Sequence, residues 1–150
     1  MFVAKYKALS FIQPYAWLTA TGIKPIDNRS RYTNFRGKFY IHASKKSNPN
    51  IAGLNEDWII ERLSEYERER YFTEPKTLGA IIGEAVLVDC VKEHISKWFV
   101  GKYGLIIHGA KLYNEPIPCR GKLNFFIPEL TEVESDIELL SRHDATREDD

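Results

Sequence analysis

The stretch TLGAIIGEAVLVDCV, residues 77–91, decides the fold. Its aliphatic and β-branched composition predicts a strand, with Gly79 and Gly83 at bulges or at points of close backbone approach. Two further strands are predicted over 105–113 and 122–128, and the chain between these strands leaves no room for helices. A parallel α/β sheet needs helices alternating with strands. The region therefore favours an α+β domain built on a mixed or closed sheet.

The chain before this stretch alternates short extended segments with one helix. Residues 8–12 predict a strand that ends before Pro14, and Pro14 suits the start of a helix that runs to Gly22. Residues 26–29 are expected to be extended, because Pro25 blocks continuation of the helix.

Two further elements are predicted between these parts. Residues 38–44 alternate apolar with polar side chains, which predicts a half-buried strand with His42 and Ser44 on one face. Asn55, followed by two acidic residues, predicts a helix N-terminus. Apolar residues then recur at helical spacing as far as Phe72, so one helix is expected there.

The composition is that of one globular domain. The chain has 150 residues, of which 43% are hydrophobic and 28% charged, as in ordinary folded proteins. We expect residues 1–130 to form a single domain and residues 131–150 to form an acidic C-terminal tail that is partly disordered. No apolar run approaches the roughly 18 residues of a membrane span, and no signal-peptide pattern is found. These features predict a cytoplasmic protein that does not contact membranes.

The sequence carries no familiar cofactor or metal signature. It has no glycine-rich phosphate-binding loop before a helix and no Gly-x-Ser-x-Gly motif. Its two cysteines are too few for a disulfide framework or a four-thiolate zinc site. Cys90 and His94 have a spacing that metal ligands can have, yet nothing nearby completes a ligand set, and a buried thiol is expected at Cys90. We therefore expect neither a metal nor a cofactor.

The formal net charge of zero hides a segregation of charge along the chain. Residues 1–50 carry nine basic side chains and one acidic one, whereas residues 129–150 carry nine acidic and two basic ones. A local positive field attracts polyanions, and the phosphates of RNA are such a partner. The alternatives are that the two ends neutralise each other in the fold, or that both are simply solvated.

The basic segment contains the pattern Gly-x-Lys-x-x-Asp-x-Arg, which starts at Gly22. In an extended segment, Asp27 and Arg29 point to the same face, and Lys24 stands at its entrance. The two cations can then bind a phosphate, while the carboxylate orients them or accepts a hydrogen bond from a base edge. An ordinary surface ion pair between Asp27 and one of these cations is the alternative.

Several segments together resemble the ASCH domain, a family of the PUA-like β-barrel superfamily. They are LSFIQPYAWLTATGIKPIDNRS (9–30), FRGKFYIHAS (35–44) and LGAIIGEAVLVDCV (78–91), followed by Trp98, and the similarity spans residues 8–127. The resemblance implies an α+β fold, namely a PUA-like small mixed β-barrel with flanking helices. It also implies a cleft beside the first helix that binds RNA or a nucleotide-like ligand.

The family pattern has glutamate where this chain has Asp27, so the charge is kept and the reach is one methylene shorter. The resemblance implies that Lys24, Asp27 and Arg29 line the cleft. The other residues that we expect to contact RNA or ligand are Arg36, His42, Ser44, Lys45 and Trp98.

Alternatives remain open for some of these residues. Arg36 can instead anchor a turn, and His42 and Ser44 can make ordinary hydrogen bonds on a strand face. Among the aromatic side chains, Trp17 is expected in the core and Trp98 in an exposed loop.

Two classes of function fit the resemblance. Binding of RNA or of a modified nucleoside is favoured, and the alternative is a small hydrolase, either a ribonuclease or an amidohydrolase acting on an acylated nucleoside. Lys24 and Asp27 would be the catalytic residues of such an enzyme. In ASCH-like amidohydrolases, however, a threonine stands where this chain has Asp27, so the proposed nucleophile is missing. A carboxylate near Lys24 keeps the ammonium protonated, which favours anion binding. A third possibility is that the acidic tail covers the basic cleft.

Overall fold

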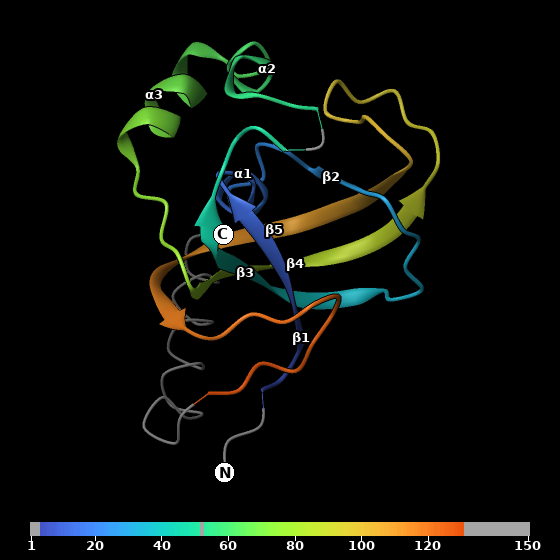
Figure 1. Ribbon diagram of the computed structural model, residues 1–150, viewed down its shortest axis with the longest axis vertical. Coiled ribbons are helices and arrows are strands. Elements are labelled where there is room, and N and C mark those ends of the chain that lie inside the picture. Colours follow the sequence, from blue (N-terminus) through green and yellow to red (C-terminus); the bar gives the residue numbers. More distant parts are fainter. Residues whose placement is uncertain (1–3, 52, 131–150) are drawn as a thin grey trace.

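The computed structural model describes residues 4–51 and 53–130 (Figure 1). The predicted acidic tail, 131–150, lies outside the described residues. The elements follow in the order β1 (Lys7–Gln13), α1 (Tyr15–Ala20), β2 (Ile26–Arg29), β3 (Gly37–Ser47), α2 (Glu56–Ile60), α3 (Glu65–Thr73), β4 (Ala80–Val91) and β5 (Tyr103–Pro118). No helix in the described parts is long and apolar enough to span a membrane.

All five strands belong to one sheet, in the order β1-β3-β4-β5-β2. β1 pairs with β3 in parallel, and the other neighbours pair antiparallel. The α+β class and the mixed sheet are thus confirmed. β1 and β2 are the two edges, and no backbone ladder joins them in residues 4–51 and 53–130. The sheet is therefore open, and the predicted closed barrel is not confirmed.

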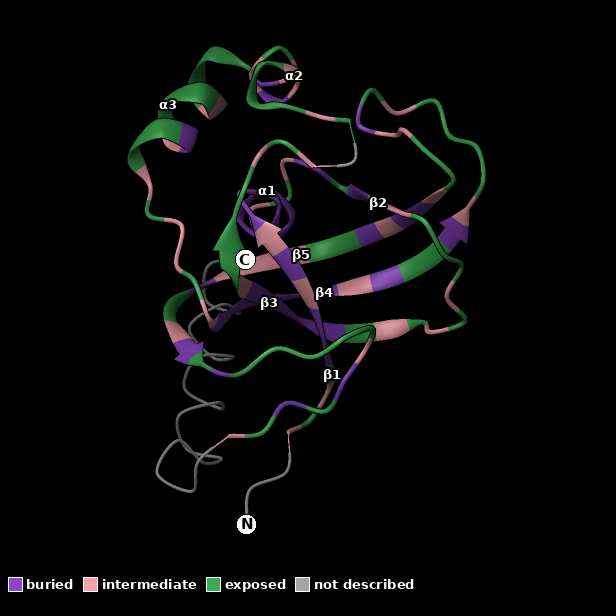
Figure 2. Ribbon diagram, viewed as in Figure 1, coloured by how far each residue is buried: buried purple, intermediate pink, exposed green. Residues whose placement is uncertain are grey.

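Strand β3, which lies between β1 and β4, is buried on both faces between Phe39 and Ala43, as the purple stretch in Figure 2 shows. Alternate side chains enter two different apolar clusters. The prediction of a half-buried strand is wrong here, because the chain after β5 covers the second face. Phe126 belongs to that cover, and its backbone pairs with that of Ala8.

Helix α1 lies between the sheet and the pair of helices α2 and α3 (Figure 1). All six of its residues are buried, and the core position predicted for Trp17 is confirmed at 1% exposure. Leu18 packs in the same cluster as Ile59 of α2 and Tyr71 of α3. Since both sides of α1 are covered, the turn that follows it and leads to Lys24 has a fixed position.

The helical region after residue 55 differs from its prediction. Asn55 is the N-cap of α2, as expected, and its side chain accepts a hydrogen bond from the backbone of Trp58. A second helix begins after Ser64, whose side chain forms a capping box with Glu67. A capping box satisfies backbone donors that a continuous helix would satisfy internally. The single predicted helix is therefore two.

The last strand also differs from its prediction. β5 continues beyond 105–113 to Pro118, whereas Phe126 forms an isolated bridge in place of a strand over 122–128. β2 pairs only with residues 103–106 of β5. Among the strands of residues 4–51 and 53–130, none other than β4 pairs with β5 beyond Ile106, and Pro116 lies in this part of β5.

Candidate ligand cavity

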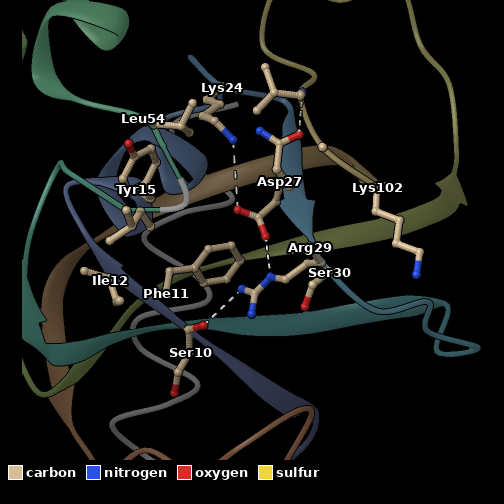
Figure 3. A pocket seen from close by; sticks show the side chains of 14 residues that line it. Ser10, Phe11, Ile12, Tyr15, Lys24, Asp27, Arg29, Ser30, Leu54 and Lys102 are labelled. Carbon is tan, nitrogen blue, oxygen red and sulfur yellow. Dashed lines mark hydrogen bonds and ion pairs between the residues drawn. The ribbon is translucent and has the colours of Figure 1, made fainter.

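A cavity of about 490 Å³ opens between the two edge strands of the sheet (Figure 3). β1 contributes Ser10 and Phe11 to its wall, and β2 contributes Asp27 and Arg29. The walls are mostly apolar, with the charged groups gathered at β2. Because β1 and β2 do not pair, side chains span the space between them.

Lys24 lies at the inner wall of this cavity and is only 1% exposed. Its Nζ donates to the carbonyl oxygen of Ile26 at 2.6 Å and lies 4.0 Å from Asp27 Oδ1. Burial lowers the pKa of Lys24, although the charge of Asp27 raises it. The carboxylate is the effect that the sequence predicts, whereas in the fold removal of water from the ammonium has the larger effect on the Lys24 pKa.

Arg29 bridges the two edges of the sheet. Its Nε donates to Asp27 Oδ2 at 2.6 Å, and its Nη2 donates to the Ser10 carbonyl oxygen of β1 at 3.1 Å. The guanidinium also lies over the Phe11 ring, 5.0 Å from its centroid. A guanidinium has five N–H donors, and its other hydrogens have no partner in the described part of the chain. The side chain is 33% exposed, so these hydrogens are available to a ligand.

Tyr15 of α1 supplies an aromatic wall beside Lys24. Its hydroxyl donates to the Pro49 carbonyl oxygen at 2.7 Å. Burial, with a smaller contribution from Asp27, raises the pKa of Tyr15 to about 12. The phenol is therefore neutral at physiological pH, and the ring is held in place by its hydrogen bond.

The three charged residues of the sequence pattern thus meet in one cavity, while most other candidates lie elsewhere. Arg36 donates to the carbonyl oxygens of Thr33 and Phe35 at 2.8 and 2.7 Å, as in the turn-anchoring alternative. Ser44 and Lys45 lie in the C-terminal part of β3, and neither lines the cavity. A ligand in the cavity alone does not reach these three residues.

Trp98 is buried at 3% exposure, so the expectation of an exposed ring is wrong. Trp58 of α2 covers it edge-on, with ring centroids 5.5 Å apart. The Trp98 carbonyl oxygen accepts a hydrogen bond from Asn28 Nδ2 at 2.9 Å, and the Val100 amide donates to Asn28 Oδ1 at 3.0 Å. Asn28 therefore ties β2 to the loop that carries Lys102 to the cavity rim.

His42 is buried on the opposite face of the sheet from Phe11. Its Nε2 lies 2.7 Å from the Cys119 carbonyl oxygen, and its Nδ1 lies 2.9 Å from Ser10 Oγ. A carbonyl only accepts, so Nε2–H is the donor and Nδ1 accepts from the serine hydroxyl. Gly121 covers this pair, since a Cβ there would lie 2.7 Å from His42 Cε1. His42 does not line the cavity and adjoins it only through Ser10, which does. Its hydrogen bonds are those of the alternative in which it acts on a strand face.

The burial of His42 predicts a pH-dependent stability. Burial lowers its pKa from the ordinary value of 6.5, so the unfolded state binds the proton more readily. The contribution of His42 to the free energy of unfolding is complete above pH 6.5. It falls as the pH drops towards the folded-state pKa, by at most about 1.4 kcal/mol per pH unit. We expect the free energy of unfolding in urea to differ less between pH 7.5 and pH 5.5 for His42→Gln than for the native chain. Equal differences would contradict the prediction.

Several cavity residues were missed by the sequence analysis. They come from two loops far apart in the chain and have no shared pattern that would identify them. These residues are Ile51, Leu54, Val100, Gly101 and Lys102. Asn28 lies inside the recognised pattern, but nothing in the sequence indicates which loop it holds.

Comparison with known proteins gives a partial likeness. No family model matches the chain. Over 87 residues the chain is 33% identical to human activating signal cointegrator 1 and 32% identical to the mouse protein of that name. The matched segment is 57% of this chain, and the chain covers 14% of the length of each relative. The chain is thus similar to one part of these proteins, which is consistent with the ASCH resemblance.

Proposed function

We propose that the cavity binds RNA or a modified nucleoside, with the base inside and, when the ligand is RNA, a phosphate at Arg29. The observation that carries the proposal is the Asp27–Arg29 pair at the wall of an otherwise apolar cavity of about 490 Å³. Pockets for small organic ligands are of this size and have few, well-placed polar groups.

The base half of the ligand fits the apolar walls. Phe11, Tyr15 and Leu54 border the space in which a flat heterocycle would lie (Figure 3). Asp27 Oδ2 accepts a hydrogen bond from Arg29, whereas Oδ1 has, within residues 4–51 and 53–130, only the 4.0 Å contact with Lys24. This oxygen can accept a hydrogen bond from a ring N–H or an exocyclic amine, as carboxylates do from base edges.

The phosphate half of the ligand fits the charges at the opening. Arg29 offers its remaining N–H donors there, and the exposed Lys102 adds a second positive charge at the rim. Charge-assisted hydrogen bonds of this kind are about twice as strong as neutral ones. We therefore expect binding to weaken as salt increases, because bound counterions are released from the ligand.

The test is titration of the chain with short single-stranded RNA and with free modified nucleosides over a series of salt concentrations. Arg29→Gln removes the charge and should weaken RNA binding at least tenfold, since a hydrogen bond to a charged group contributes about 1.5–3 kcal/mol. The slope of log affinity against log salt should fall by about 1.

Arg68→Gln is the matched control, since Arg68 is exposed on α3 and does not line the cavity. It should leave the affinity within twofold of the native chain. Equal effects of the two substitutions would contradict binding at the cavity. Absence of any binding would make the proposed function wrong.

Hydrolysis of RNA or of an acylated nucleoside is the second candidate, favoured by one observation. Burial lowers the pKa of Lys24, as a lysine that acts as a base requires. Mass spectrometry of the same mixtures would detect cleavage or deacylation. Lys24→Met keeps the bulk of the side chain, so turnover that this substitution abolishes would establish an enzyme in place of a binding protein.

A further inference from the structure

We propose that the ligand is a single-stranded oligonucleotide that occupies two adjoining cavities, with Arg29 at the phosphate between two nucleosides. The inference rests on the proposed function and specifies its ligand. A second cavity, of about 590 Å³, adjoins the first and shares Arg29 and Ser30 with it. Each cavity has the size of a small-molecule site, so one nucleoside leaves the second cavity empty.

The second cavity has a different lining from the first. Residues 31–33, directly after β2, form one side, and residues 123–125 form the other. Phe125 is fixed by a stacked contact with Phe35, whose ring centroid is 4.3 Å away. This cavity is more polar than the first, which suits the sugar and phosphate of a nucleotide.

Arg29 stands at the boundary with its orientation fixed. Asp27 holds its Nε at 2.6 Å, and the Ser10 carbonyl oxygen holds Nη2 at 3.1 Å. These two hydrogen bonds fix the orientation of the guanidinium and of its remaining N–H donors. Little conformational entropy is therefore lost when these donors bind an anion. A phosphodiester that joins nucleosides in the two cavities would lie at this boundary.

Tyr32 provides a stacking surface in the second cavity. It is 51% exposed, and its ring is held by an edge-on contact with Tyr103 at 5.9 Å and by Arg36 at 5.7 Å. Bases stack on exposed aromatic rings of this kind without regard to sequence. The exposed Arg31 beside it adds positive charge to the same cavity.

The test compares RNA ligands of increasing length on the full chain by isothermal titration calorimetry. The probes are nucleoside 5′-monophosphates, dinucleotides and hexanucleotides of one base composition. The dinucleotide should bind at least tenfold more tightly than the monophosphate, and extension to six nucleotides should add much less than the second nucleotide did.

Variants assign this gain to the second cavity. Tyr32→Ala should weaken dinucleotide binding about tenfold, as loss of one stacked base does, and should change monophosphate binding less than twofold. Tyr66→Ala is the matched control, because Tyr66 is a 70% exposed tyrosine on α3. Arg31→Gln, at an exposed position, provides a second test. It should lower the slope of log affinity against log salt for the dinucleotide by about 1.

Three results would overturn the inference. Equal affinity for monophosphate and dinucleotide would mean that one nucleoside fills the site, and the proposed function would stand. A length effect that neither Tyr32→Ala nor Arg31→Gln reduces would place the second nucleotide outside this cavity. No binding of any probe would overturn the proposed function together with the inference.

Discussion

Replacing Asp27 by alanine is expected to lower the free energy of unfolding by about 3 kcal/mol, because it leaves a buried cation without its counter-charge. Lys24 is 1% exposed and lies 4.0 Å from the carboxylate, while Arg29 donates to the same group at 2.6 Å. Denaturant unfolding at pH 7 measures the effect.

Lys24→Met is the informative comparison for Asp27→Ala. Asp27 keeps Arg29 as its partner when the lysine charge is removed. We therefore expect Lys24→Met to lower the free energy of unfolding by less than half as much as Asp27→Ala does. The double variant should be more stable than the sum of the two single losses predicts, because contacting residues are not additive. A loss below about 1 kcal/mol for Asp27→Ala would show that the carboxylate does not stabilise this group of charges.

Gly83→Ala is expected to destabilise the protein by about 3 kcal/mol or more. A Cβ at this position would lie 2.2 Å from the Lys111 carbonyl oxygen and 3.3 Å from Ala20 Cβ. The first contact is with the backbone of β5 and the second with α1, so neither can rotate away. Strand β4 or helix α1 must move, and α1 carries Tyr15 at the cavity wall.

Gly109→Ala is the control for Gly83→Ala. Gly109 has φ of +60°, yet a Cβ there meets nothing within 4 Å. Its cost is therefore the backbone conformation alone, about 1–2 kcal/mol. Thermal unfolding of both variants separates the two causes. A loss for Gly83→Ala no larger than for Gly109→Ala would contradict the steric argument.

Local signals in the sequence predicted most of the secondary structure. Pro14 and Gly22 predicted the two ends of α1, and the alternation over 38–44 predicted β3. Both signals depend only on residues that are neighbours along the chain. The closed barrel was not confirmed, since whether β1 pairs with β2 depends on how far the whole sheet curls. The length of β5 was missed because proline is rare inside a strand, whereas in the fold Pro116 lies in a part of β5 that, among the described strands, pairs with β4 alone.

The candidate site was predicted where its residues are close in sequence. Lys24, Asp27 and Arg29 lie within six positions, so the direction of one strand brings them together. Trp98 could not be placed in the same way, because the helix that covers it lies some forty residues earlier in the chain. Its contacts depend on tertiary packing, for which one sequence carries no local signal.

The placement of β1 and β2 at opposite edges of the sheet has a consequence for folding on the ribosome. Both strands are synthesised before β3, β4 and β5, but Ile26 of β2 pairs with Ile106 of β5. Closing so long a loop is slow, because its entropy is lost before contacts compensate for it. The strand that pairs with β2, and so holds Asp27 and Arg29 in the sheet, is therefore made only after most of the domain has been synthesised. A ligand can stabilise only the finished fold, and so it cannot assist the nascent chain before β5 has been made.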